Sequence, residues 1–205
     1  MSFLTNLISG LSLGSVYAII ALGYTMVYGI SKMLNFAHGD VIMVGGYVSF
    51  ILNMYVGMNG WLALLIAMVV CTVLGILIER LAYRPLRGTG SLAVLITAIG
   101  VSYFLQNSAL LIWGANPRVF PSLFEGAKTI HAYNGQLSIA PASIFTIAAN
   151  IVIMVILTLF VSKTKAGKAM RAVSEDNGAA QLMGINVNQS ISLTFAIGSG
   201  LAAVA

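Results

Sequence analysis

Long apolar stretches follow one another along this chain, with few charged residues within or between them. Only 7% of the 205 residues are charged, whereas about a quarter are charged in soluble domains. A chain with so few charges cannot cover a water-facing surface. The apolar stretches are near-continuous and do not alternate with polar residues, which excludes an outer-membrane barrel and predicts an all-α polytopic membrane protein.

The lengths of the apolar stretches predict where helices cross the membrane. A helix needs about 20 residues to cross roughly 30 Å of hydrocarbon. The chain stops inside an apolar stretch, so we expect a single transmembrane domain over residues 1–205 that is incomplete at its C-terminal end. The predicted spans lie near 5–28, 41–56, 60–78, 92–113, 141–162 and 191–205.

The basic residues predict the orientation of these spans. Segments 79–91 and 163–190 hold seven of the ten Lys and Arg residues, whereas the loop between them holds Arg118 and Lys128. Cytoplasmic loops carry an excess of Lys and Arg. We therefore predict that both basic segments are cytoplasmic and that the N-terminus is extracytoplasmic. The net charge of +5 then reflects these loops, and no nucleic-acid partner is expected.

The second span is unusually short. Its 16 residues would make only about 24 Å of helix. The preceding segment 29–40, GISKMLNFAHGD, is too apolar for an ordinary loop and too polar for a plain span. We predict a discontinuous element that enters the membrane, although the sequence leaves the depth of this segment open. Unwound backbone at that depth needs protein or a water-filled cavity around it, and interrupted helices indicate a transport site.

Within this segment, Asn35, His38, Gly39 and Asp40 are the candidate substrate-pathway residues. An ionisable group inside the bilayer costs several kcal/mol unless it faces a partner or water. Asp40 stands where a helix N-cap would be, so a capping role and a pathway role both remain open. For His38 we expect a hydrogen bond at the helix start, and the role of a proton carrier is the alternative. A metal is not expected there, because no second His or Cys lies nearby. Asn35 is expected to bond a neighbouring helix or to line a cavity.

The segment 169–189, AMRAVSEDNGAAQLMGINVNQ, is the second candidate region. It contains a predicted short helix with Ser174 as its cap, Glu175 and Asp176 near its positive end, and Gly184 at its end. A short helix between two spans is suited to hold a cytoplasmic partner. A surface turn is the alternative interpretation.

Motifs for nucleotide or peptide chemistry are absent from the sequence. It contains no GxxxxGK[ST] phosphate loop, no HExxH and no GxSxG. We therefore expect a transport subunit that is not an enzyme, with no cofactor or metal in this chain. If transport is driven by ATP-Mg, the ATPase must be a different subunit.

Four blocks resemble, in the same order, the LivH-type permeases of branched-chain amino acid ABC transporters. They are LSLGSVYAIIALGYTMVYGISKMLNFAHGDVIMVGGY, ERLAYRPLRG, SLAVLITAIGVS and RAVSEDNGAAQLMGINV. The resemblance implies the helical bundle of an ABC importer permease in a prokaryotic cytoplasmic (inner) membrane. It also implies a LivM-type permease partner, two cytoplasmic ABC ATPases and an extracytoplasmic amino-acid-binding protein. Substrates would be leucine, isoleucine or valine.

The resemblance extends to the residues that would meet these partners. Segment 174–185 is similar to the importer coupling element, whose pattern is EAA, three residues, then Gly. Gly178 stands where that pattern has glutamate. The implied ATPase-coupling residues are Ser174, Glu175, Asp176, Ala179, Ala180 and Gly184. Loop 114–140 would help to receive the binding protein, with Arg118, Glu125 and Lys128 as rim contacts.

Three other functions are compatible with parts of the sequence. A permease of the same family for urea or short-chain amides would share these motifs. A channel is disfavoured because no ring of charged residues is evident. A membrane-embedded enzyme would need a catalytic cluster, for which NFAHGD is the one candidate.

Overall fold

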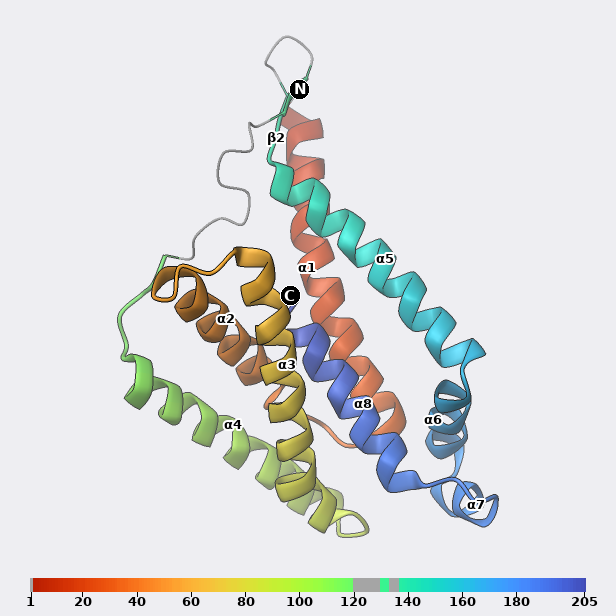
Figure 1. The fold of residues 1–205 in the computed structure, drawn as a ribbon. Helices are drawn as coiled ribbons and strands as arrows, with labels where there is room; N and C mark the ends of the chain where they lie inside the picture. The colour runs from red at the N-terminus through yellow and green to blue at the C-terminus, as the bar shows by residue number, and fades with distance from the viewer. Residues whose placement is uncertain (1, 120–129, 133–136) are drawn as a thin grey trace.

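The computed structural model describes residues 2–119, 130–132 and 137–205, which form a bundle of helices (Figure 1). In chain order, its elements are α1 (Ser2–Ser31), α2 (His38–Met54), α3 (Gly60–Ile78), the π-helical turn η1 (Glu79–Tyr83), the 3₁₀ turn η2 (Arg84–Leu86), α4 (Ser91–Trp113), β1 (Ile130–Ala132), β2 (Leu137–Ile139), α5 (Pro141–Lys163), α6 (Lys165–Glu175), α7 (Asn177–Leu182) and α8 (Val187–Ala202). The two short strands pair antiparallel, with Ile130 opposite Ile139.

The fold is that of an all-α polytopic membrane protein, as predicted. Among the described residues, four helices are long and apolar enough to cross a membrane: Asn6–Ser31, Gly60–Leu86, Ser91–Trp113 and Pro141–Lys163. Helices α2 and α8 are shorter, with 17 and 16 residues. Both lie against the longer helices in the middle of the bundle (Figure 1).

Helix α8 packs between α1 and α3 and forms the centre of the bundle (Figure 1). Small residues make this packing possible. A Cβ atom on Gly75 of α3 would lie 2.5 Å from the Cβ of Ser199 on α8. A Cβ atom on Gly198 would lie 3.0 Å from the carbonyl oxygen of Gly23 on α1. Close backbone approach of this kind is how membrane helices associate without a hydrophobic driving force.

Two long helices lie at the edge of the bundle. Helix α5 has no buried residue and packs along α1, whereas α4 meets α2 and η1 through a few residues (Figure 1). Their outward side chains are large and apolar, for example Leu111 and Ile156. In a bilayer such surfaces contact lipid or another apolar helix at no solvation cost.

The structure corrects two predicted boundaries. Helix α1 continues to Ser31, so the non-helical break covers 32–37 and is shorter than 29–40. The chain continues helically from α3 through η1 and η2 to Leu86, where a loop from residue 79 was expected. The two basic segments do lie at the same end of the bundle, because Arg87 of the first donates to Asn188 of the second.

Candidate functional site

Hydrogen bonds fix the chain where α1 ends and the break before α2 begins. Ser31 Oγ donates to the carbonyl of Val27 and accepts from the amide of Met33 at 3.2 Å, which closes the end of α1. Lys32 follows with a φ of 55°, a left-handed conformation that turns the chain away from the helix. The chain then runs without helical structure to the start of α2.

Asn35 is fixed by a residue distant in the sequence. The hydroxyl of Tyr83 in η1 donates to Asn35 Oδ1 at 3.1 Å. Tyr83 is itself fully buried, and its ring packs against Phe195 of α8 with centroids 5.3 Å apart. Asn35 therefore bonds a neighbouring helix, one of the two roles considered for it. The break is anchored to η1 and, through Tyr83, to α8.

His38 lies in a tight space between helices. Its side chain is 3% exposed, and its ring lies edge-on to Tyr24 and directly against Gly23, where any Cβ would come within 2.9 Å of the ring. Among the described residues, neither ring nitrogen makes a hydrogen bond of good geometry, and the polar group near the ring is the backbone of Ile20 on α1. The expected hydrogen bond at the start of its own helix is therefore wrong.

Asp40 joins α2 to α4. The helix begins at His38 after Ala37, so Asp40 lies within the first turn and is not the N-cap, contrary to one of its two predicted roles. Its Oδ1 accepts from Gln106 Nε2 at 3.0 Å, and Gln106 also donates to Ser102 Oγ. A carboxylate in the first turn is favourable there because the helix start carries partial positive charge.

The burial of these residues limits what they touch in this chain. Asn35, His38 and Asp40 are 3%, 3% and 7% exposed, whereas Gly39 is exposed. A cavity of about 370 Å³ beside the break is lined by Ser31 and its neighbours but by none of these three side chains. Their side chains are thus packed inside the bundle of this subunit. Whether they shape a path between two subunits stays a prediction.

The second candidate region forms α6 and α7. Asp176 caps α7, because its Oδ1 accepts from the amides of Gly178 at 2.7 Å and Ala179 at 3.1 Å. Ser174 instead donates to the carbonyl of Arg171 inside α6, so its predicted capping role is wrong. Gly184, with a φ of 80°, follows the end of α7 as predicted.

Helix α7 is attached to the bundle by one side and exposed on the other. Ala180 is buried, whereas Glu175 at the end of α6 and Ala179 are exposed. Leu182 and Met183 are 90% and 82% exposed, although both are large and apolar. In Figure 1, α6 and α7 lie at the lower end of the molecule, where α8 begins. Leu182 is the last residue of α7, and Met183 directly follows it.

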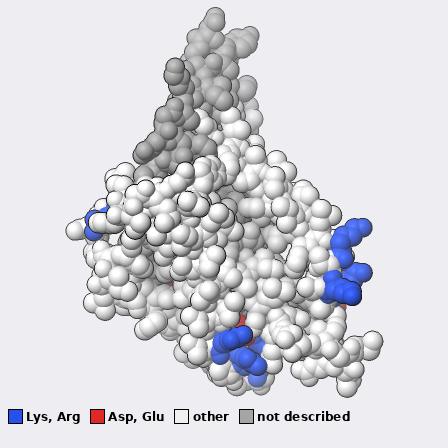
Figure 2. All heavy atoms as spheres, viewed as in Figure 1, with Lys and Arg blue, Asp and Glu red and all other residues white. Residues whose placement is uncertain are grey.

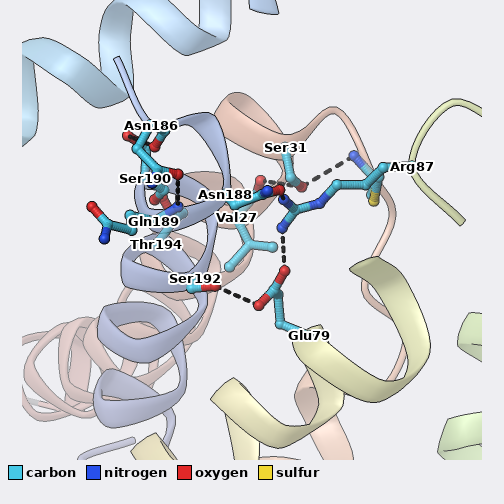
Figure 3. A network of polar contacts seen from close by, with 11 residues as sticks. Val27, Ser31, Glu79, Arg87, Asn186, Asn188, Gln189, Ser190, Ser192 and Thr194 are labelled. Atoms are coloured by element: carbon cyan, nitrogen blue, oxygen red, sulfur yellow. Dashed lines mark hydrogen bonds and ion pairs between the residues drawn. The ribbon is translucent and has the colours of Figure 1, made fainter. Parts of the chain in front are cut away.

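A buried carboxylate that the sequence interpretation did not single out lies close to this region (Figure 3). Glu79 is fully buried at the end of α3. Its Oε1 accepts from Arg87, and its Oε2 accepts from Ser192 of α8 at 2.5 Å. Arg87 also donates to Asn188 Oδ1. The signal in the sequence was a single acid at the end of a long apolar stretch, where burial requires a partner.

This network connects the segment after α7 with α3. Asn186 follows α7 and caps α8, where its side chain accepts from the amide of Gln189 at 3.1 Å (Figure 3). Burial lowers the pKa of Arg87, while the charge of Glu79 opposes that effect. The guanidinium remains charged at any physiological pH. The ion pair joins η1 to the residue after η2, and the hydrogen bonds of the same two side chains with Asn188 and Ser192 connect it to the start of α8.

The predicted contacts for a binding protein are only partly described. Arg118 follows α4, is exposed, and lines a cavity of about 200 Å³ with Tyr47 and Phe50 of α2. Glu125 and Lys128 lie outside the described residues. Within the described part of the chain, no three His, Cys, Asp or Glu side chains come together as metal ligands.

Comparison with known proteins assigns a family to this arrangement. Residues 6–205 match the family described as branched-chain amino acid transport system / permease component. The chain is 44% identical over 212 residues to the high-affinity branched-chain amino acid transport system permease protein LivH of Escherichia coli K12, with 99% of this chain and 69% of LivH covered.

Two further relatives show the range of the family. BraD of Pseudomonas aeruginosa, a high-affinity branched-chain amino acid transport system permease protein, is 43% identical over 213 residues, covering 99% of this chain and 69% of BraD. LivM of Escherichia coli K12, a permease protein of the same transport system, is 26% identical over 214 residues, covering 95% of this chain and half of LivM. No solved structure matches the chain. The chain belongs to the family of branched-chain amino acid transport system permease components.

Proposed function

We propose that this chain is one membrane-spanning half of an ATP-driven importer for leucine, isoleucine and valine. Its relatives LivH and BraD are named as high-affinity branched-chain amino acid transport permeases. A zwitterion cannot cross hydrocarbon unaided, because its charges lose their hydration. A permease supplies a polar path instead. This chain carries no nucleotide-binding motif, so the energy comes from other subunits and the chain is a transport subunit without enzymatic activity.

The second half of the path is a LivM-type permease. LivM is similar to this chain over 95% of this chain and half of LivM, which supports a pair of related subunits that face each other. The path would run between the two halves, beside the break of residues 32–37. Asn35, His38 and Asp40 would shape it from behind, by fixing the break and the first turn of α2. The exposed Gly39 would leave that turn open to the partner.

The exposed surface of α7 is the observation on which the proposal of an ATP-driven importer rests. Its free face presents Leu182 and Met183 at the end of the bundle where the basic segments meet. Two ATPase subunits that use ATP-Mg would bind there, one of them at α7. Asn186 and the Glu79–Arg87 network would then transmit movement of α7 to α8 and α3. A rigid connection of this kind is what lets a remote binding event bias a helix bundle.

The basic residues at this end of the molecule support an orientation in the membrane. Lys and Arg side chains gather where α3 ends and at the junction of α5 with α6 (Figure 2). These ends would be cytoplasmic in the inner membrane, which leaves the N-terminus and Arg118 extracytoplasmic. An amino-acid-binding protein would deliver substrate at that side.

Reconstitution tests this proposal. The full-length protein is assembled in proteoliposomes with its LivM-type partner, the two ATPases and the binding protein, and uptake of radiolabelled leucine is measured. We expect uptake that needs ATP-Mg, the binding protein and this chain. Uptake of labelled urea or acetamide in place of leucine would contradict the substrate, and uptake without ATP would contradict the mechanism.

A further inference from the structure

A groove of about 450 Å³ lies between the end of α3 and the start of α8. Two arginines, Arg80 and Arg84, form one wall. Asn188 and Gln189 from the first turn of α8 contribute amide groups to the other wall. The groove shares Asn186, Asn188 and Ser192 with the network between α8 and α3, but it includes neither the break of residues 32–37 nor Leu182 and Met183.

The charge of this groove is uncompensated. Arg80 and Arg84 are four residues apart on a helical segment, so their side chains lie on one face. Both are exposed, and the nearby carboxylate of Glu79 is already taken by Arg87 and Ser192. No acidic residue lines this groove among the described residues. The result is a local positive charge of about two beside the end of a membrane-crossing helix.

Amide donors and a helix start add to the attraction for an anion. The first turn of α8 carries partial positive charge from the helix dipole, although the amide of Gln189 is already bound by Asn186. Asn188 has its Oδ1 engaged by Arg87, which leaves its amide nitrogen as a donor (Figure 3). Guanidinium groups with further N–H donors around them match the oxygens of a phosphate.

The rest of the groove is largely apolar. Ile76, Leu193 and Ala196 supply apolar side chains there, and Asn186 and Ser192 complete the lining. Ile76 precedes Arg84 by eight residues, which is about 12 Å along a helix. The groove therefore passes from a basic, polar end to an apolar end within the membrane-crossing part of α3. A soluble phosphate would use only the polar end, whereas a phospholipid fits both.

We propose that this groove binds an anionic phospholipid, with its phosphate between Arg80 and Arg84 and an acyl chain against Ile76 and Leu193. The bound lipid would lie beside the Glu79–Arg87–Asn188 network, which joins α3 to the start of α8. Occupancy would thus stabilise the connection between these two helices. This proposal needs the membrane fold and does not depend on which solute the protein transports.

Native mass spectrometry of the full-length protein in its assembled complex tests the proposal. Phosphatidylglycerol and phosphatidylcholine are added in parallel, and the retained lipid is counted. We expect the wild-type protein to retain phosphatidylglycerol, and R80Q/R84Q to retain at least ten-fold less. R80K/R84K should retain more than R80Q/R84Q, because lysine also binds phosphate as a point charge. If R80Q/R84Q does not assemble, the single variants Arg80→Gln and Arg84→Gln are tested in its place.

A matched control separates a site from general charge. K163Q/K165Q removes two positive charges at the α5–α6 junction, outside the groove, and should retain phosphatidylglycerol like the wild type. Equal loss in both double variants would overturn the proposal, as would equal retention by R80Q/R84Q and the wild type. Displacement of the lipid by millimolar inorganic phosphate would assign the groove to a soluble anion and would also overturn it.

Discussion

Arg87 and Glu79 form an ion pair in which the carboxylate is fully buried and the guanidinium side chain is 16% exposed. The pair closes the end of α3 against the start of α8, because the same two side chains also bond Asn188 and Ser192. Both hydrogen-bond partners of this carboxylate, Arg87 and Ser192, lie outside α3. The contact therefore carries both stability and the connection between two helices.

Removing the carboxylate should destabilise the protein strongly. Glu79→Ala leaves the Arg87 guanidinium largely buried without its counter-charge, and we expect a loss of about 3 kcal/mol in the free energy of unfolding. E79A/R87A should lose less than the sum of the two single variants. Unfolding of the purified protein in detergent measures all three. Arg118→Gln, at an exposed arginine, serves as the control, and unfolding of Glu79→Ala at the wild-type midpoint would contradict the expectation.

The contact of Gly75 with Ser199 makes a second prediction. Gly75→Ala places a methyl group 2.5 Å from the Ser199 Cβ, so α3 and α8 must move apart. We expect a loss of about 1–3 kcal/mol. G75A/S199G should regain part of the loss, because the second change removes the obstructing atoms.

A glycine with open space supplies the control for this pair. A Cβ atom on Gly100 of α4 would meet no other atom within 4 Å, so Gly100→Ala should be neutral or should stabilise the protein by up to about 1 kcal/mol. Thermal unfolding in detergent compares the variants. If Gly75→Ala and Gly100→Ala behave alike, the close packing of α3 on α8 is contradicted.

Hydropathy was sufficient to predict the class of fold, because the thickness of the bilayer sets a length that apolar stretches must match. It did not predict that the helix continues past Ile78. Glu79 looked like the start of a polar loop, since one of its two partners, Ser192, lies 113 residues away in the sequence. A buried charge is tolerated only with such a partner, and one sequence does not reveal a pair at that separation.

The local rules for helix N-caps did not identify the capping residue correctly in two places. Ser174 and Asp176 both suit an N-cap, and the chain uses Asp176, which has the extended backbone with φ of −152° that a cap requires. The N-cap of α2 is Ala37, which precedes Asp40, so the Asp40 carboxylate does not cap the helix. It accepts instead from Gln106 of α4, 66 residues away. A tertiary contact therefore decided the role of Asp40. The break between α1 and α2 was predicted, because a short apolar stretch can be recognised from the local sequence alone.

The hydrogen bond between Gln106 and Asp40 predicts how transport responds to substitution. Asp40→Ala should abolish leucine uptake in the reconstituted complex, because α2 loses its polar link to α4 beside the break. Asp40→Asn keeps an oxygen that accepts from Gln106 and should keep more than half of the uptake. Gln106→Leu should behave like the alanine variant.

Assembly must be measured together with uptake. Each variant is purified with its partner subunits, and the amount of complex is compared with the wild type by size-exclusion chromatography. We expect normal amounts for all three variants. Normal uptake by Asp40→Ala in an intact complex would remove Asp40 from the transport mechanism.

The exposed side chains of α7 predict where an ATPase binds. L182S/M183S changes two side chains that are 90% and 82% exposed, so the fold of this chain should be unaffected. The apolar contact with the ATPase would be lost. We expect the variant to insert in the membrane normally but to bring down at least ten-fold less ATPase in a pull-down from detergent extracts.

Two further variants test whether α7 itself must be formed. Asp176→Ala removes the cap that accepts from Gly178 and Ala179, at a cost of about 1 kcal/mol to a helix of six residues. ATPase capture should therefore fall. Ser174→Ala, two residues away, removes only a bond to the Arg171 carbonyl within α6 and should leave capture unchanged. If Ser174→Ala reduces capture as much as Asp176→Ala, the bound surface is α6, and the assignment of α7 as the docking helix fails.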